Sequence, residues 1–319
     1  MKTPLLSTLI AIPLLALTLP VAAQQTRLII PAPPGGGTDG FFRTVAQAAN
    51  EALDSTLVVM NVGGAGGSIG MNQMIRSVPD GTTLAAVWSS PVTAIPHTLK
   101  KSYGPDDFIP IIPIIQISSA PYVFCVNADF PAHTGKGMIE ELDRNPGKYS
   151  YSNDGIGGTG QLASERIFRA KHLSVLGVPF KGAGDTLNNF LGKHVDIYVG
   201  SILPIKPHLA AGKVFCPLVS SAARAPSPPD AASLTDIGIP EEETLLWRGI
   251  LGPKGTPPAI VEKLQAAFTH AARKPEIRKF VEDSGEEVVI RTGAELEQML
   301  RQEYEALGKV AESLGVAKQ

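Results

Sequence analysis

One pattern recurs along the chain and restricts its fold more than any other: a short β-branched run, a loop rich in Gly, Ser or Pro, and then an amphipathic helix. The first copy reads RLIIPA, PPGGGTD and GFFRTVAQAANEAL, over residues 27–53. Five further copies begin with the strands TLVVMNV, GTTLAAVW, KYSYSND, LSVLGVPF and HVDIYVG. Strands that alternate with helices predict an α/β fold with mostly parallel sheets flanked by helices. In such folds ligands bind beyond the carboxyl ends of the strands, where these loops lie.

Two stretches interrupt this alternation and predict two domains. The segment FIPIIPIIQISSAPYVFCVN is long, apolar and extended, without a helical period, and VFCPLVSSAARAPSPPDAASL resembles a return crossing. We expect domain 1 to comprise residues 24–121 and 225–319, and domain 2 to comprise residues 122–224. The residues after the return crossing are mostly helical and charged in pattern, and we expect them to pack on domain 1.

The N-terminus has the pattern of a secretory signal peptide, residues 1–23. Lys2 precedes an apolar run that contains Pro13 and Pro20, and small residues end the run at Ala23. A retained membrane helix is the alternative, but the run is short for spanning a bilayer. We therefore expect an exported chain, cleaved near Ala23, in the periplasm.

Composition excludes several classes of function. The net charge is −2, so the chain lacks the basic surplus of proteins that bind nucleic acid or anionic membranes. The histidines are scattered without HExxH or CxxC motifs, so we expect no metal, no cofactor and no catalytic residues. Cys125 and Cys216 lie in apolar, β-like runs, where a disulfide is conceivable. We favour two buried thiols, because spacing cannot decide connectivity.

The segment PAPPGGGTDGFF, residues 31–42, has the features of an anion site. A strand, consecutive glycines and a helix start would direct several backbone N–H groups and the positive helix end at one point. The segment lacks the spacing of a Walker A loop or a Rossmann fingerprint. Thr38 and Asp39 are candidate helix caps, and Arg43 is placed to pair with Asp39. An ordinary tight turn followed by a cap is the alternative.

A second segment, DGIGGTGQ at residues 154–161, repeats the design. Two such loops facing each other across a cleft would offer neutral backbone donors to a small anion, since neither contains an arginine. Ser89 and Ser90 end a strand and either cap the next helix or bind a carboxylate oxygen. Phe180 either forms a wall of the cleft or is a core aromatic, and Lys181 is expected in solvent.

The stretch GGAGGSIG contains a G-x-S-x-G motif centred on Ser68 and suggests a secreted serine hydrolase as an alternative function. The nucleophile elbow of α/β-hydrolases requires the strand to run almost directly into the serine. Here five residues separate Val62 from Ser68. The motif therefore argues weakly for a hydrolase.

Several of these segments, in their order along the chain, resemble the periplasmic solute receptors of tripartite tricarboxylate transporters, the Bug or TctC-like family. The resemblance runs from about Arg27 to the C-terminus. It is carried by PAPPGGGTDGFFR, by GGAGGSIG followed by SVPDGTTL, by YSNDGIGGTGQLASERI, by VPFKGAGDTLNNFLGKHVDI and by WRGILGPKGTPPAIVEKL.

The resemblance implies a Venus-flytrap fold that captures a small organic carboxylate between two lobes. Backbone groups and bridging waters would hold the ligand, and a membrane permease would be the partner of a monomeric receptor. An orphan receptor that feeds a sensor protein is the alternative. The candidate ligand-binding residues are Pro34, Gly35, Gly36, Gly37, Thr38, Asp39, Ser89, Ser90, Gly158, Thr159, Gly160 and Phe180.

The sequence also departs from the family pattern. Gln161 stands where the family often has histidine, which would alter how the far end of the ligand is held. Phe41 and Phe42 replace smaller residues. If Phe41 faces the cleft, the ligand is expected to be an aromatic or longer apolar carboxylate.

Overall fold

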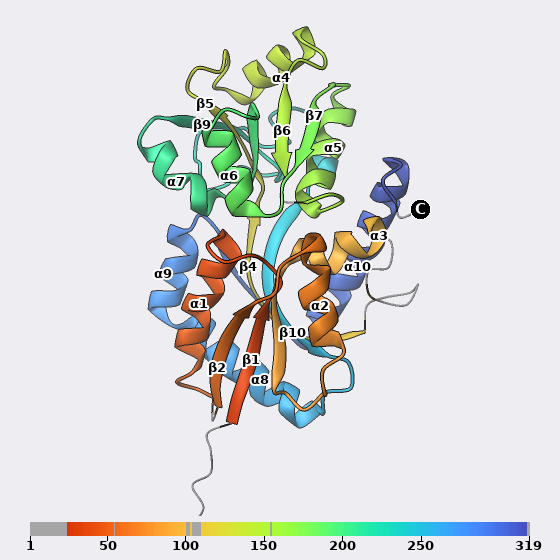
Figure 1. The fold of residues 1–319 in the computed structure, drawn as a ribbon. Helices are drawn as coiled ribbons and strands as arrows, with labels where there is room; N and C mark the ends of the chain where they lie inside the picture. The colour runs from red at the N-terminus through yellow and green to blue at the C-terminus, as the bar shows by residue number, and fades with distance from the viewer. Residues whose placement is uncertain (1–23, 54, 100–102, 104–109, 154, 318–319) are drawn as a thin grey trace, which may run out of the picture.

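The computed structural model describes residues 24–53, 55–99, 103, 110–153 and 155–317. The predicted signal peptide, residues 1–23, lies outside the described residues. The described chain forms two β-sheets, each flanked by helices (Figure 1).

Sheet A has six strands in the order β11-β4-β10-β3-β1-β2. β1 pairs in parallel with β2 and β3, whereas β10 pairs antiparallel with β3 and β4, and β11 pairs antiparallel with β4. Its strands are β1 Gln24–Ile30, β2 Ser55–Asn61, β3 Thr83–Trp88, β4 Ile111–Pro121, β10 Leu245–Pro253 and β11 Glu287–Arg291.

Sheet B has five strands in the order β7-β6-β8-β5-β9. β6 pairs in parallel with β7 and β8, and β5 pairs antiparallel with β8 and β9. Its strands are β5 Val123–Asn127, β6 Ser150–Asn153, β7 Leu176–Pro179, β8 Ile197–Gly200 and β9 Val214–Val219.

The α/β class is confirmed, but the sheets are mixed rather than mostly parallel. The antiparallel pairs involve the strands that carry the chain between the sheets. β4 leads from sheet A directly into β5 of sheet B, and the chain returns from β9 to β10. The C-terminal part, expected to be mostly helical, supplies β10 and β11 to sheet A. β10 lies inside the sheet because it pairs on both sides.

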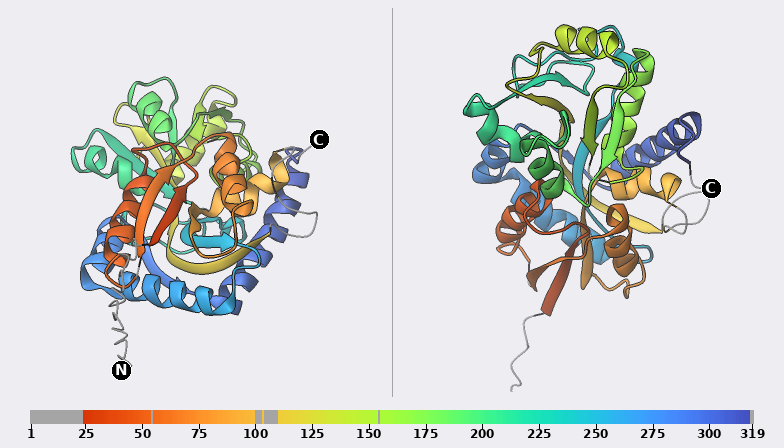
Figure 2. Two further views of the ribbon diagram at one scale, coloured as in Figure 1. Left: turned by 60° about the horizontal axis from the view of Figure 1, so that its bottom comes forward. Right: turned by 45° about the horizontal axis from the view of Figure 1, so that its top comes forward.

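Helices cover both faces of sheet A (Figures 1 and 2). One face packs against α1, α8 and α9, and the other packs against α2 and α10. The C-terminal helices thus pack on sheet A, as expected. These helices are α1 Gly37–Ala49, α2 Ser68–Ile75, α8 Pro258–Arg273, α9 Pro275–Asp283 and α10 Gly293–Ser313.

Sheet B also has helices on both faces. Residues of α4 and α5 share one core with Phe124 and Tyr151, and residues of α6 and α7 share another with Val123 and Tyr198. The helices are α4 Gly135–Arg144, α5 Thr159–Ala170, α6 Ala183–Leu191 and α7 Ile202–Ala210, and the short helical segments of the chain are η1 Ala65–Gly67, η2 Ser90–Ala94, α3 Ile95–Thr98 and η3 Pro240–Glu242. None of the helices in the described part of the chain combines the length and apolarity needed to cross a lipid bilayer.

Two expectations about side chains are corrected. Cys125 and Cys216 form a disulfide rather than remaining as thiols. They lie on the antiparallel neighbours β5 and β9, where a register shift between Phe124 and Val126 brings them opposite each other. Phe41 does not face a cleft, because it is fully buried in the core between α1 and sheet A. Phe41 therefore gives no information about the ligand.

Candidate functional site

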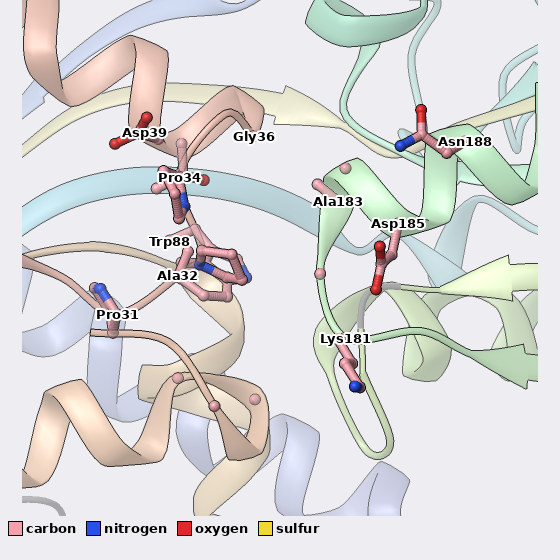
Figure 3. A pocket seen from close by; sticks show the side chains of 17 residues that line it. Pro31, Ala32, Pro34, Gly36, Asp39, Trp88, Lys181, Ala183, Asp185 and Asn188 are labelled. Carbon is pink, nitrogen blue, oxygen red and sulfur yellow. The ribbon is translucent and has the colours of Figure 1, made fainter. Parts of the chain in front are cut away.

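A cavity of about 410 Å³, here called the outer cavity, lies beyond the carboxyl ends of β1, β2 and β3. One wall consists of residues that follow or end these strands, and the opposite wall consists of the loop after β7 and the first turns of α6 (Figure 3). The lining residues on the sheet A side are Pro31, Ala32, Pro33, Pro34, Gly36, Thr38, Asp39, Gly64, Gly66, Gly67 and Trp88, and those on the sheet B side are Lys181, Gly182, Ala183, Gly184, Asp185 and Asn188.

The first wall is built by the loop between β1 and α1. The prolines restrict the backbone as it leaves β1. Gly35 then adopts a φ of +85°, a conformation that disfavours other residues, and Gly36 is the N-cap of α1. No side chain caps α1, so the expectation that Thr38 or Asp39 does so is wrong. Both lie in the first turn of the helix.

Asp39 holds this loop in place. Its carboxylate accepts hydrogen bonds from the Gly35 N–H at 3.0 Å, from Arg43 Nε at 3.0 Å and from Asn61 Nδ2 at 2.9 Å. The expected pairing of Asp39 with Arg43 is confirmed. Burial by itself would raise the pKa of Asp39, but the hydrogen bonds from Gly35, Arg43 and Asn61 lower it below its usual value. The Asp39 carboxylate thus stabilises the loop through these hydrogen bonds, and Arg43 balances its negative charge.

The opposite wall is built by the N-terminus of α6. This helix begins at Ala183, also without a side-chain cap. The two walls come close together here: a Cβ atom built on Gly36 would lie 3.6 Å from the Ala183 Cβ, and one built on Gly182 would lie 3.3 Å from the Pro33 Cδ. The first N–H groups of a helix have no intrahelical acceptor. Two helix N-termini therefore direct unbonded donors and partial positive charge at one cavity from opposite sides.

The second glycine-rich segment has a different environment from the one predicted. The Thr159 N–H donates to Ser90 Oγ at 3.2 Å, and the Thr98 hydroxyl donates to the Gly157 carbonyl at 2.8 Å. The N-terminus of α5 thus packs against the segment that follows β3. Gly158 is buried there, and residues 155–161 of this loop are not among those that line the outer cavity.

The structure therefore brings together only part of the predicted site. Pro34, Gly36, Thr38 and Asp39 line the outer cavity. Gly35 lies in the same loop, and Gly37 lines a smaller cavity that adjoins it. The Ser89 hydroxyl lies 3.4 Å from the Tyr122 hydroxyl, and Phe180 packs beside the core that α6 covers. The predicted residues that line neither cavity are Gly35, Ser89, Ser90, Gly158, Thr159, Gly160 and Phe180.

The adjoining cavity, here called the inner cavity, has a volume of about 20 Å³. It shares Thr38, Trp88 and Ala183 with the outer cavity. Its remaining lining residues are Gly37, Tyr122, Thr186, Tyr198, Val199, Gly200, Ser201, Leu246 and Arg248.

Sequence reasoning missed several lining residues, and Trp88 and Arg248 are the two with buried polar groups that lack a partner among the described residues. Trp88 is the last residue of β3, and the sequence argument considered only the serines that follow it. Arg248 lies in β10, which belongs to the part of the chain that was expected to be mostly helical. Its guanidinium is 1% exposed, pairs with Glu286 and lies 5.1 Å from the centre of the Phe41 ring. The sequence did contain a signal for each residue. Trp88, whose indole carries an N–H donor, ends an apolar run, and Arg248 is a charged residue within one.

The structure offers little for the alternative chemistries. Ser68 begins α2 and is 5% exposed, and within the described residues its hydroxyl forms no hydrogen bond with a histidine. Among the residues whose positions are described, no group of three or more His, Cys, Asp or Glu side chains could hold a metal ion.

Comparisons with known proteins agree with this architecture. A family model described as "Tripartite tricarboxylate transporter family receptor" matches residues 41–316. The chain is 30% identical to the UPF0065 protein in the gbd 5′ region of Cupriavidus necator, over 92% of this chain and 89% of the relative.

Solved structures give the same result. The periplasmic binding protein BugD superposes with a TM-score of 0.84 and 29% identity, covering 92% of this chain and 99% of that protein. R. palustris Rpa4515, whose structure was determined with adipate, superposes with a TM-score of 0.85 and 23% identity, covering 92% of this chain and 98% of that protein.

Proposed function

Because the chain belongs to the tripartite tricarboxylate transporter receptor family, we propose that it captures a small organic carboxylate and delivers it to the membrane permease of such a transporter. The similar protein BugD is a periplasmic binding protein, which supports a periplasmic location for this chain. We further propose that residues 1–23 are removed on export, and that the mature chain is a monomer. Its two lobes would be residues 24–121 with 225–319, and residues 122–224.

One observation carries the proposal: the N-termini of α1 and α6, both without a side-chain cap, face one cavity from opposite sheets. Backbone N–H groups at helix N-termini are good donors to carboxylate oxygens, and the helix dipoles favour a negative charge there. The likeness to Rpa4515 is at a level that shows the fold alone, so the adipate in that structure does not identify this ligand. The adipate is consistent with a carboxylate ligand for a protein of this fold.

The two walls also suggest how capture would work. Residues of both walls line one cavity, and at Gly36 and Gly182 a single added Cβ atom would reach the opposite wall, so a ligand between them contacts both sides. A ligand that binds both walls favours the closed arrangement by its differential affinity for that state. Capture would thus couple carboxylate binding to closure of the two lobes.

Calorimetric titration of the protein from residue 24 onward tests the proposal. The protein is first unfolded and refolded to remove any bound ligand, and it is then titrated with a panel of carboxylates and with the amide of each acid. We expect one-to-one binding of a carboxylate and at least tenfold weaker binding of its amide, a difference of about 1.4 kcal/mol. Equal affinities for acid and amide, or no binding of any carboxylate, would contradict the proposal.

A further inference from the structure

We infer that the inner cavity binds one oxygen of the ligand's carboxylate, and that Trp88 and Arg248 are the side chains that select for it. This inference rests on the proposed function and extends it to the class of ligand: a monocarboxylate whose apolar body occupies the outer cavity.

Trp88 gives the first reason. Its indole is 7% exposed and lines both cavities, and within the described residues its Nε1–H has no hydrogen-bond partner. Figure 3 shows the ring on the wall opposite Lys181 and Asp185. The other tryptophan, Trp247, is also buried, but its Nε1–H donates to Glu303 at 2.5 Å. A buried donor without an acceptor is unfavourable, so its presence in a cavity wall indicates an acceptor that enters the cavity.

Arg248 gives a second, independent reason. One guanidinium nitrogen pairs with Glu286, which also accepts a hydrogen bond from Ser118 at 2.6 Å. The Arg248 Nε–H has no partner among the residues described, and the side chain lines the inner cavity. Two polar groups in one small cavity thus lack an acceptor, and both are donors.

The position of Arg248 strengthens this reason. A Cβ atom built on Gly37, the first residue of α1, would lie 3.4 Å from Arg248 Nη2 and 3.0 Å from Ser201 Oγ. The guanidinium therefore lies against the N-terminus of α1, where the helix dipole already contributes partial positive charge. Glu286 accepts from one guanidinium nitrogen, which leaves the Nε–H without an acceptor among the described residues. An anionic oxygen in the inner cavity would satisfy both the guanidinium and the helix end.

The volume of the inner cavity indicates which part of the ligand can enter it. A volume of about 20 Å³ accommodates one atom of the size of a water or an oxygen, but not a whole organic molecule. Because the inner cavity shares Thr38, Trp88 and Ala183 with the outer cavity, a carboxylate at their junction can place one oxygen inside. Its other oxygen would remain in the outer cavity, near the N-terminus of α6.

The outer cavity indicates the rest of the ligand. Pro31, Ala32, Pro33, Pro34 and Trp88 form an apolar wall. The charged lining residues are Asp39, which is already bonded to Arg43, and the exposed Lys181 and Asp185 on the opposite wall. A second or third carboxylate on the ligand would lie beside prolines and two acidic residues. Lys181, which is exposed, would be the one cationic side chain in the described lining available to balance its charge. An aromatic or alkyl body would instead bury apolar surface.

The experiment uses the two tryptophans as a matched pair. Wild type, Trp88→Phe and Trp247→Phe are each titrated by calorimetry with phenylacetate, hexanoate, adipate and citrate. Phenylalanine keeps an aromatic ring but removes the Nε1–H. We expect phenylacetate or hexanoate to bind wild type at least tenfold more tightly than citrate. Trp88→Phe should weaken that binding about tenfold, and Trp247→Phe should leave it within a factor of two.

Fluorescence provides a second readout. The bound monocarboxylate should change the emission of Trp247→Phe, in which Trp88 remains, and not that of Trp88→Phe. Unchanged affinity in Trp88→Phe would overturn the inference, since the inner cavity would then hold water rather than ligand. Tightest binding of citrate or adipate would overturn the assignment of class and leave the proposed function intact. Absence of any carboxylate binding would overturn both.

Arg248→Lys provides the same test if Trp88→Phe does not fold. Lysine keeps the positive charge but lacks the Nε–H and the planar guanidinium. The inference predicts at least tenfold weaker binding of the monocarboxylate by a folded Arg248→Lys protein, and unchanged binding would contradict it.

Discussion

The loops that begin α1 and α5 have the same local design but different roles. In each, a glycine with positive φ, Gly35 at +85° or Gly157 at +71°, precedes a glycine N-cap. In each, the N–H of the first glycine donates to a side chain four residues later, to Asp39 in the first loop and to Gln161 in the second. The first loop lines the outer cavity, whereas Gly157 and Thr159 of the second are buried against Thr98 and Ser90.

This difference shows that local sequence specifies the loop conformation and the direction of its N–H groups, and that the surroundings specify what those groups meet. The Thr159 N–H meets a protein hydroxyl, that of Ser90. The N–H groups of the first turn of α1 face a cavity. The place of the second loop opposite α1 is taken by residues 181–188, whose pattern KGAGD is less rich in glycine.

The largest predicted effect concerns Gly157→Val. The new Cβ would lie 2.1 Å from Thr98 Oγ1, and the φ of +71° disfavours a β-branched residue. We expect the free energy of unfolding, measured in urea, to fall by about 2–4 kcal/mol. Gly35→Val is the matched control, because its φ is also positive but no atom lies within 4 Å of the new Cβ. Equal losses in both variants would show that backbone strain, which both loops share, accounts for the loss, and would contradict a role for packing on Thr98.

The next effect concerns ligand binding by the first loop. Gly36 has an extended backbone, so valine is tolerated there, but the new Cβ would already lie 3.6 Å from the Ala183 Cβ, and the two γ-methyl groups would occupy space between the walls. We expect Gly36→Val to bind its carboxylate about a hundredfold more weakly, a loss of about 2.7 kcal/mol, measured by calorimetry. The free energy of unfolding should change by less than about 0.5 kcal/mol.

The control for Gly36→Val is Gly40→Val on the same helix. Gly40 is exposed and has no atom within 4 Å of the new Cβ. If both valine variants bind like wild type, the wall formed by α1 and α6 does not contact the ligand.

The smallest effect concerns pH. The folded-state pKa of Asp39 is lowered, so the bonds of this carboxylate stabilise the fold above the unfolded-state pKa, near 3.9, and this stability is lost as the pH falls through the folded-state value. We expect Asp39→Asn to cost about 1 kcal/mol at pH 7, and the difference from wild type to shrink below about pH 4. Urea unfolding of both proteins at pH 7, 5 and 3 measures this difference in the free energy of unfolding.

Gln161→Ala is the matched variant for Asp39→Asn. The Gln161 side chain accepts a hydrogen bond from the Gly157 N–H in the second loop, as the Asp39 side chain accepts one from the Gly35 N–H in the first. The amide does not titrate, so the cost of Gln161→Ala should be the same at all three pH values. A cost of Asp39→Asn that does not vary with pH would contradict the role assigned to its charge.

Much of the fold follows from the sequence because it depends on local periodicity. The repeated order of strand, glycine loop and helix predicted β1 to α3 and β6 to α7 close to their observed bounds. The pairing of Asp39 with Arg43 followed from their spacing of one helical turn. β10 was missed because its apolar run, LLWRGILGP, contains two glycines and an arginine, and only pairing on both sides makes it a central strand.

The features that only the tertiary structure decided depend on contacts between residues far apart in the chain. Cys125 and Cys216 are 91 residues apart, and the register of β5 against β9 decides that they bond. The return of β10 places Arg248 against the start of α1, and the packing of the α5 loop on Thr98 leaves α6 to form the second wall. The sequence by itself determined the elements, their order and the donor groups at each helix start. The tertiary structure decided which donors share a cavity, because strand register and helix packing are set by burial of surfaces that no local pattern specifies.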